Sequence, residues 1–402
     1  MGTAGIIIEY DPMHTGHLHL MEETRRHLGA DTALVGVMSG SFVQRGEFAV
    51  VGKYARARAA VESGMDLVLE LPLPWAVATA ERFAEGGVQA LAATGVVDHL
   101  AFGSECGDAA ALQKLAAVLC SGELEAALQQ ELSVGDSYAA ARQRAVERLL
   151  TKEEASLLAS PNNILGVEYC KAILRQGSAM RPVTIPRSGS AHNGAVEEGK
   201  HPSASAIRAL LQEGEREQAL GLMAPRMKEA YLAEEAAGRA PVFGETCERA
   251  ILARLRSMTR EDFAALDEGR EGLSNRLYDA SRSAVSVAEV LEAAKTKRYA
   301  YARLRRMVLW AYLGVDVRTL PEKIPYLRLL AANGRGRELL GRMRKCASIP
   351  VVTKTNQIRR LGGEAETLLE LEIRAADLYA LSYPDLTAAR GGSVWREAPV
   401  LI

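Results

Sequence analysis

The chain has 402 residues, 48% of them hydrophobic, and its 49 Lys and Arg nearly balance 50 Asp and Glu, for a formal net charge of −1. A chain of this length and composition can form two or three domains with sizeable cores, and its charge excludes a protein that attracts polyanions through net charge alone. Its five cysteines contain no CxxC pair, which argues against a disulfide framework or a thiolate zinc site.

The N-terminus runs directly into strand-like sequence, without the basic and apolar regions of a signal peptide. The sequence also lacks a run of about 18 apolar residues that could cross a membrane. We therefore expect a cytoplasmic protein without membrane spans.

Short apolar runs alternate with helical patterns through the first hundred residues. The apolar runs cover residues 5–8, 32–38, 65–71 and 96–103, and helical patterns at 17–28, 53–64 and up to about 95 separate them. This alternation predicts βαβ units and a Rossmann-like parallel sheet with both faces buried, an α/β fold. A further strand is expected at 181–187 and a helix at 203–214. Beyond that helix the pattern is mostly helical, so we predict one domain at 1–215 and a helical domain at 216–402.

The loop after the first expected strand carries two histidines, His14 and His17, beside Gly16. Pro12 disfavours helix at Asp11, so we expect the helix to be led by His17. Ligands of parallel sheets bind at the carboxyl ends of the strands, and the free amides of a helix start favour anions. Two imidazoles at this point can donate to phosphate oxygens during phosphoryl chemistry. The alternative is a solvated pair of histidines.

The sequence HTGH after a buried strand resembles the HxGH signature of nucleotidyltransferases, in which both histidines hold ATP phosphates. Longer blocks are more specific: GIIIEYDPMHTGHLHL, SGSFVQRGE, KYARARAAVESGMDLVLELP, FGSE, SPNNILGVEY, IPRSGSAH, SASAIR and KTKRYAYARLRR. Their content and order resemble the tRNA(Met) cytidine acetate ligase family from residue 5 to about 360. The resemblance implies that ATP activates acetate as acetyl-adenylate, and that the acetyl group passes to N4 of the wobble cytidine of elongator tRNA(Met).

The resemblance implies catalytic roles for His14 and His17 and an ATP site built from several short segments. Its residues would be Ile7, Ile8, Glu9, Tyr10, Asp11, Pro12, Met13, His14, Thr15, Gly16, His17, Leu18, His19, Leu20, Gly103, Asn162, Asn163, Arg187 and Ser188. Family members usually have Asn and Phe where this chain has Asp11 and Met13. A carboxylate at Asp11 would repel the triphosphate unless Mg²⁺ or a basic neighbour intervenes.

Each of the other blocks also has a purely structural interpretation. Gly103 fits a strand-to-helix turn, and Asn162 and Asn163 fit a cap before a helix. Ser203 or Ser205 is either a plain helix cap or, with Arg208, an anion-binding turn. For the block from Ser39 to Glu47 there are two interpretations: it shapes the acetate or cytidine pocket, or it only connects two secondary-structure elements.

The basic segment Lys295–Arg306 is the predicted RNA-binding face. It contains Lys295, Lys297, Arg298, Arg303, Arg305 and Arg306, two tyrosines and no acidic residue. Such a pattern is typical of phosphate contacts with aromatic rings available for stacking. A solvated helix is the alternative. A second basic stretch follows at 334–345.

No metal-binding cluster is expected, and Mg²⁺ would accompany ATP. Most of the remaining histidines, which are His19, His27, His99, His192 and His201, are interpreted as structural. Two other functions stay open: a small-molecule adenylyltransferase acting on nicotinate mononucleotide or phosphopantetheine, and a non-catalytic module that binds ATP and RNA.

Overall fold

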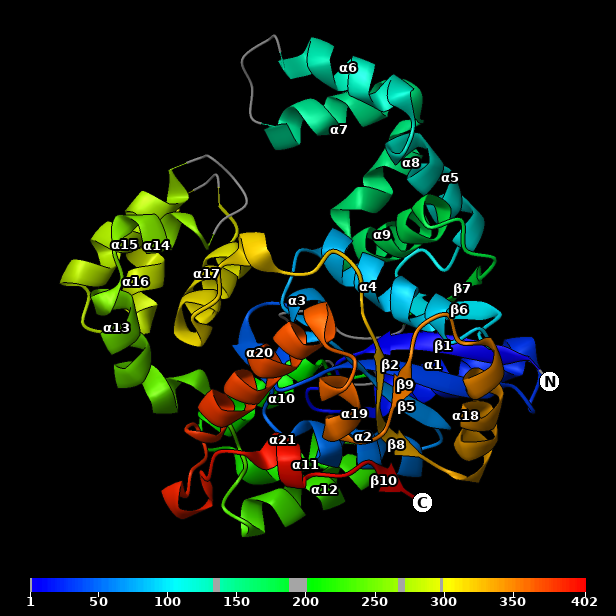
Figure 1. Cartoon of the computed structure of the whole chain (residues 1–402). Helices are drawn as coiled ribbons and strands as arrows, with labels where there is room; N and C mark the ends of the chain where they lie inside the picture. The colour runs from blue at the N-terminus through cyan, green and yellow to red at the C-terminus, as the bar shows by residue number, and fades with distance from the viewer. Residues whose placement is uncertain (1, 133–137, 188–200, 267–271, 297–298) are drawn as a thin grey trace.

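The computed structural model describes residues 2–132, 138–187, 201–266, 272–296 and 299–402. Lys297, Arg298 and Ser188, three of the predicted site residues, lie outside these ranges, as does His192. A twisted sheet occupies the middle of the described chain, with helices on both faces (Figure 1). No helix in the described ranges has the length and apolar character needed to span a bilayer.

The sheet has the order β10-β8-β5-β2-β1-β6-β7, and β9 pairs with β8. Its strands are β1 (Thr3–Ile8), β2 (Ala33–Ser39), β5 (Leu67–Leu71), β6 (His99–Ser104), β7 (Arg181–Pro186), β8 (Leu327–Ala332), β9 (Val351–Val352) and β10 (Val400–Leu401). A small antiparallel hairpin, β3 (Phe42–Val43) with β4 (Glu47–Phe48), stands apart from it. The five strands from β1 to β7 in this sheet pair in parallel, as the apolar runs predicted.

The second half of the chain returns to the sheet, which its helical pattern did not predict. β8 pairs antiparallel with β5, with Leu67 opposite Ala332, and β10 pairs in parallel with β8. β8 is buried at every position, so its sequence, LRLLAA, reads equally well as part of a buried helix. The sheet is therefore mixed, although the expected α/β class is confirmed.

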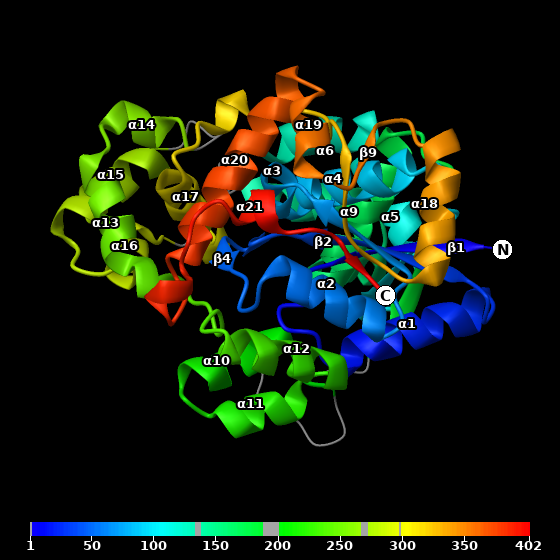
Figure 2. The same ribbon diagram turned by 60° about the horizontal axis from the view of Figure 1, so that its bottom comes forward.

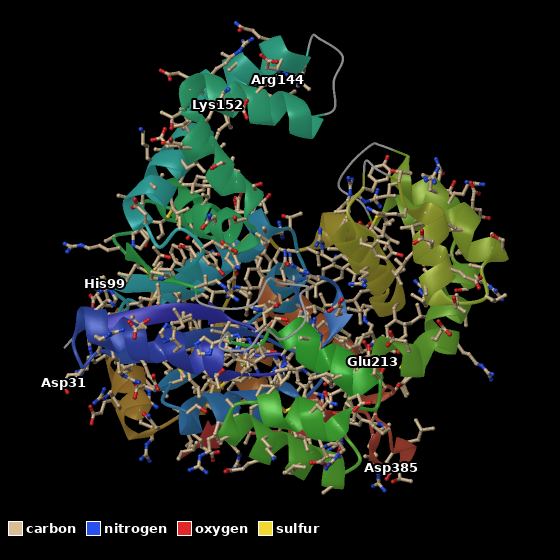
Figure 3. The ribbon with its side chains drawn as sticks, turned by 180° about the vertical axis from the view of Figure 1, so that it is seen from behind. Asp31, His99, Arg144, Lys152, Glu213 and Asp385 are labelled. Carbon is tan, nitrogen blue, oxygen red and sulfur yellow. The ribbon has the colours of Figure 1, made fainter. Side chains whose placement is uncertain are left out.

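The N-terminal half supplies most of the helices that cover the sheet. They are α1 (Thr15–Leu28), α2 (Lys53–Glu62), α3 (Leu73–Ala76), α4 (Ala80–Ala93), α5 (Ala109–Leu119), α6 (Gly122–Leu132), α7 (Tyr138–Leu149), α8 (Lys152–Ser156), α9 (Pro161–Arg175) and α10 (Ala204–Gln212). Helices α1 and α2 lie on one face and α4 and α9 on the other (Figure 2). Helices α6 and α7 form a hairpin that projects from the body, where Arg144 of α7 pairs with the buried Glu131 of α6 (Figure 3).

The remaining α-helices all lie C-terminal to residue 215. They are α11 (Arg216–Leu222), α12 (Pro225–Ala236), α13 (Glu248–Ser257), α14 (Arg260–Ala264), α15 (Leu273–Ser283), α16 (Val287–Ala294), α17 (Tyr301–Leu313), α18 (Gly334–Cys346), α19 (Thr355–Arg359), α20 (Gly363–Ala380) and α21 (Ser393–Arg396). Helices α13 to α16 form a cluster at one side of the molecule, and α17 joins it to the sheet (Figure 1).

Two apolar cores hold these layers together. One lies between α1, α2, α12 and the sheet, and the other runs from α4 and α9 across the hairpin to α13, α17 and α20. Phe48 connects the hairpin to α17 and α20 within the second core, because its ring lies 6.1 Å from that of Tyr312 and 6.2 Å from that of Tyr379. Burial of these rings fixes the hairpin against α17, and thereby places the helical cluster beside the carboxyl ends of the parallel strands.

Candidate nucleotide-binding site

The turn from β1 into α1 holds His14 and His17 in a fixed arrangement. His14 is the N-cap of α1, and its Nδ1 accepts from the Gly16 amide at 3.1 Å. The Nδ1 of His17 accepts from the His14 amide at 3.2 Å, which completes a capping box. The helix thus begins at Thr15, two residues before the predicted start, because the imidazoles satisfy amides of its first turn.

These hydrogen bonds also determine the tautomer of both rings. Since each Nδ1 accepts a hydrogen bond from a backbone amide, the ring proton of each neutral imidazole is on Nε2. Burial lowers the pKa of His14 to about 3, with smaller contributions from Arg187 and His201. Burial, with the neighbouring imidazole of His14, lowers the pKa of His17 well below its ordinary value. Both residues are therefore neutral hydrogen-bond donors at physiological pH.

The two histidines line a cleft of about 620 Å³ at the carboxyl ends of β1 and β6. Its walls come from the β1–α1 loop, the β3–β4 hairpin and the starts of α9 and α10. The predicted residues that line it are Ile7, Ile8, Glu9, Tyr10, Asp11, His14, His17, Leu20, Gly103, Asn162 and Arg187. A small adjoining pocket adds Gly16 and His19. This volume is in the range of nucleotide-sized sites, about 300–1,000 Å³.

Two predicted contacts point into the protein instead. Met13 is fully buried in the core beside α12, and Asn163 is 2% exposed. The Asn163 side-chain oxygen accepts from the amides of Glu105 and Cys106 at 3.0 and 3.1 Å, so it supports the loop after β6. Packing holds the Met13 side chain and backbone hydrogen bonds hold that of Asn163, so contact of either residue with ATP stays a prediction. Pro12, Thr15 and Leu18 also lie outside the lining of either pocket within the described residues.

Asn162 and Gly103 keep positions consistent with their prediction. Asn162 lines the cleft and donates from Nδ2 to Glu105 at 2.7 Å. At Gly103 a Cβ would lie 3.1 Å from Cγ of Arg187, so glycine lets this arginine cross the end of β6. Arg187 follows β7 and lines both the cleft and the small pocket.

Asp11 does not face the cleft as an unpaired carboxylate. It is 3% exposed, its Oδ1 accepts from the Val50 amide at 2.6 Å, and its Oδ2 lies 3.6 Å from Nη1 of Arg208. Arg208 also donates to the Asp11 carbonyl at 2.7 Å. The basic neighbour that an aspartate at position 11 requires is thus Arg208. The cap at Ser203 fixes the start of α10, the helix that carries Arg208.

Glu9 is the cleft carboxyl group with the most unusual environment. It accepts from the Gln44 amide at 2.7 Å, and burial, with a smaller effect of Asp11, raises its pKa to about 7. A carboxyl group that is about half protonated at pH 7 repels a neighbouring triphosphate less than a fully ionised one does. Its environment is set by burial at the end of β1, which the sequence pattern does not show.

Sequence reasoning missed His201 and gave Glu47 only as the end of a loop. His201 was interpreted as structural, but its Nδ1 lies 3.0 Å from Thr15 Oγ1 and its ring lines the small pocket. Glu47 lines the cleft and pairs with Arg208 at 3.0 Å. Both come from segments distant from the HTGH loop, so only tertiary structure brings them together.

The predicted RNA-binding segment lies at the edge of this cleft, where Ala300 contributes to the lining. Arg305 of α17 forms an ion pair with Glu47, and Arg306 approaches the Gln44 carbonyl at 3.5 Å. Lys295 donates to the Tyr299 carbonyl. The basic side chains are therefore partly engaged within the protein, in contrast to the open face that the sequence suggested. The other basic stretch forms α18, at the opposite end of the sheet from α17 (Figure 2).

Across the described residues, no group of three or more His, Cys, Asp or Glu side chains is placed to hold a metal ion. Asp11, the carboxylate nearest His14 in sequence, is already bound by an amide and a guanidinium. The described chain thus offers no protein-built cage for Mg²⁺, whose ligands in nucleotide sites come largely from phosphates and water.

Comparison with known proteins agrees with this geometry. The family model described as HIGH Nucleotidyl Transferase matches residues 1–393. The tRNA(Met) cytidine acetate ligase of Acetivibrio thermocellus is 36% identical, with both chains covered completely, and that of Caldicellulosiruptor saccharolyticus is 38% identical over 96% of this chain and 95% of its own.

Solved structures of Thermotoga maritima TmcAL superpose over the full length of both chains at 33% identity. The TM-score is 0.95 for the apo form and 0.92 for the form bound with alpha-thio ATP. The chain therefore belongs to the HIGH nucleotidyl transferase family and, within it, to the tRNA(Met) cytidine acetate ligases.

Proposed function

We propose that this chain activates acetate with ATP as acetyl-adenylate and then acetylates N4 of the wobble cytidine in elongator tRNA(Met). The observation that carries the proposal is the pair of neutral imidazoles, His14 and His17, at the rim of a nucleotide-sized cleft. The names of relatives that match over their whole length, and the alpha-thio ATP in a structural neighbour, support the same substrates.

In the first step, an acetate oxygen attacks the α-phosphorus and the bond to pyrophosphate breaks. Negative charge shifts to the bridging and non-bridging oxygens, and Nε2–H donors of His14 and His17 stabilise it. No proton has to be removed, because acetate is already ionised. Mg²⁺ bound to the nucleotide would neutralise part of the phosphate charge.

The second step transfers the acetyl group. The cytidine N4 attacks the acetyl carbonyl carbon, the carbon–oxygen bond to AMP breaks, and N4 loses one proton. No covalent intermediate with the enzyme is required. The site thus has to hold the base and the adenylate together and exclude water, which would otherwise hydrolyse the mixed anhydride.

The contacts proposed for ATP are the residues lining the cleft, above all His14, His17, Gly103, Asn162 and Arg187. Residues 1–215 are assigned the ATP chemistry and residues 216–402 tRNA binding, with Lys295, Arg303, Arg305 and Arg306 on the RNA side. This division is functional, since β8, β9 and β10 complete the sheet from the second region. Because the proposed substrates are ATP and tRNA, the proposal includes a cytoplasmic location.

The test uses purified protein, ATP, labelled acetate and total tRNA, followed by nucleoside analysis. We expect acetylcytidine in elongator tRNA(Met) and acetate-dependent pyrophosphate exchange, both lost in His17→Ala. His27→Ala is the matched control, because His27 is exposed on the same helix. Exchange that requires a phosphorylated small molecule and leaves RNA unlabelled would overturn the proposal in favour of a small-molecule adenylyltransferase.

A further inference from the structure

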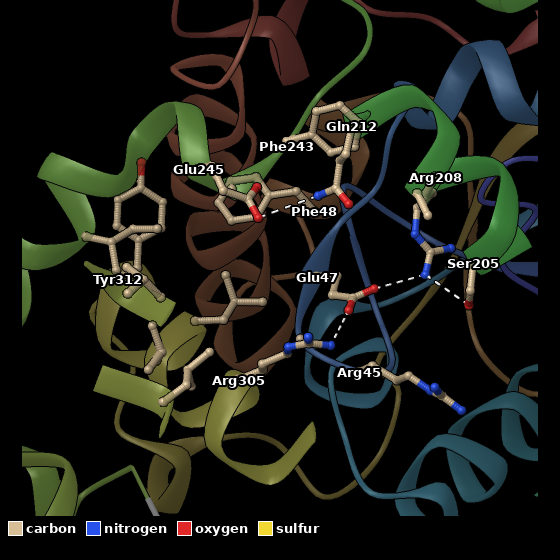
Figure 4. Close-up of a pocket in the computed structure, with 18 residues that line it drawn as sticks. Arg45, Glu47, Phe48, Ser205, Arg208, Gln212, Phe243, Glu245, Arg305 and Tyr312 are labelled. Atoms are coloured by element: carbon tan, nitrogen blue, oxygen red, sulfur yellow. Dashed lines mark hydrogen bonds and ion pairs between the residues drawn. The ribbon is translucent and has the colours of Figure 1, made fainter. Parts of the chain in front are cut away.

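A second cavity, of about 390 Å³, adjoins the nucleotide cleft (Figure 4). It lies among the hairpin strand β4, helix α10, the turn Gly244–Cys247 and helices α13, α16 and α17. Arg45, Glu47, Ser205 and Arg208 line both spaces. We call this cavity the side pocket. The nucleotide chemistry described above makes no use of it.

The side pocket combines an apolar wall with a polar rim. Its wall consists of the rings of Phe48, Phe243 and Tyr312 and of aliphatic side chains from α13, α16 and α17. Its rim carries three guanidinium groups and two carboxylates, from Arg45, Arg208, Arg305, Glu47 and Glu245. A flat heteroaromatic ring with donors and acceptors on one edge matches this combination.

Glu47 lies on the wall that separates the two spaces. One of its oxygens accepts from Arg208 at 3.0 Å, and the other pairs with Arg305 of α17 (Figure 4). Each carboxylate oxygen has two lone-pair sites, so a pair with one guanidinium leaves capacity for a further donor. Among the described residues Arg45 has no ion-pair partner, which leaves its guanidinium available to an incoming acceptor.

We propose that the side pocket receives the cytosine base of the RNA substrate, turned out of its stack, with its exocyclic amine directed toward Glu47. The inference rests on the proposed function and adds the subsite for the acceptor base. The amine would then lie at the boundary with the nucleotide cleft, where the acetyl group is activated.

The polar groups of the rim favour cytosine over uracil. Cytosine presents an N4 amine, which donates to a carboxylate, and N3 and O2, which accept from guanidinium groups. Uracil presents a carbonyl oxygen at C4 and would leave it facing Glu47. That oxygen would be repelled by the Glu47 carboxylate and could form no hydrogen bond with it, so the site discriminates against uracil.

The position of α17 explains how an RNA strand reaches the pocket. Arg303, Arg305 and Arg306 lie on this helix, and Arg305 and Val308 line the side pocket itself. Phosphates held by the basic side chains would place the adjacent nucleotide over the opening, and enzymes that modify bases commonly extrude them into such pockets.

The experiment fills the side pocket without disturbing either core. Ala209 lines the pocket from α10 and is exposed, so Ala209→Trp places an indole in the cavity, with Ala209→Ser as the matched control. Acetate-dependent pyrophosphate exchange is measured without RNA. Acetyl transfer to an anticodon stem-loop is measured in parallel, and pyrrolocytosine at the target position reports entry of the base.

We expect Ala209→Trp to retain the exchange within about twofold and to lose at least about tenfold in kcat/KM for transfer. The pyrrolocytosine signal should disappear in that variant and persist in Ala209→Ser. Transfer at the wild-type rate in Ala209→Trp would overturn the side pocket as the base site while leaving the proposed function intact. Absence of exchange in the wild-type protein would instead refute the proposed function.

Discussion

The HTGH turn and the basic segment at α17 differ in what determines the positions of their side chains. His14 and His17 bond to amides of their own turn, so three or four residues of local sequence fix both rings and their tautomers. Arg305 instead pairs with Glu47, 258 positions away, and its environment depends on how the hairpin packs on α17. A short motif at a helix start thus predicts geometry, whereas a run of charges predicts only composition.

The largest effect is expected from separating two roles of His14: it caps helix α1, and we propose that its imidazole donates to phosphate. Asparagine is a good N-cap, so His14→Asn should keep the helix start while removing the imidazole donor. We expect a loss of about 10²–10³ in the rate of acetyl-adenylate formation with little change in thermal stability. Pyrophosphate exchange and thermal unfolding measure the two quantities.

His14→Ala is the companion variant for that measurement. It should lose the same activity and, in addition, about 1 kcal/mol of unfolding free energy, because the Gly16 amide loses its acceptor. If His14→Asn were fully active, the imidazole would serve only as a cap, and the local geometry of this turn would carry no chemistry.

The next effect concerns Arg208, which joins the two regions by contacting Asp11 and Glu47. Arg208→Met leaves the buried Asp11 carboxylate without its guanidinium, and we expect a loss of about 3 kcal/mol in unfolding free energy. Burial already raises the pKa of Asp11, and removing the cation raises that pKa further. The native state then binds more protons than the unfolded state, so the loss should be greater at pH 8 than at pH 5.

Urea unfolding of two further variants tests the assignment of this loss to Asp11. Adding Asp11→Asn to Arg208→Met should restore most of the stability, since no charge remains buried. Arg226→Met removes an exposed guanidinium paired with Glu229 and should cost less than about 1 kcal/mol. A double variant as unstable as Arg208→Met would show that packing of the arginine, and not its charge, matters.

The features that could be predicted from the sequence are those set by local contacts, and the features that were missed depend on long-range contacts. The parallel strands, the helix starting near His17 and the nucleotide cleft followed from local patterns, because apolar runs and caps act over a few residues. β8 was missed because a fully buried strand has no alternating pattern. Glu47 and His201 were underrated because their neighbours belong to segments far away in sequence. For the same reason the sequence did not show that Asn163 supports the loop after β6.

A smaller effect is expected in the pH dependence of ATP binding. Burial raises the pKa of Glu9 to about 7, so this carboxyl group is mostly protonated below pH 7 and charged above it. Repulsion of the triphosphate should therefore weaken ATP affinity by about fivefold as pH rises from 6 to 8. Calorimetric titration of Glu9→Gln should show no such change over this range, since His14 and His17 remain neutral throughout. An equal pH dependence in wild type and Glu9→Gln would assign it to another group.

The smallest effect distinguishes the two basic helices in RNA binding. Arg303 lies on α17 beside the cleft, whereas Arg344 lies on α18 at the opposite end of the sheet (Figure 1). Each lost phosphate contact reduces the slope of log Kd against log salt concentration by about 1, so Arg303→Ala should show that reduction and a few-fold weaker binding. Arg344→Ala removes an exposed charge of the same type and should leave the slope unchanged. A reduced slope in Arg344→Ala instead would place the RNA on α18, far from the cleft, and would separate the basic pattern of residues 295–306 from recognition altogether.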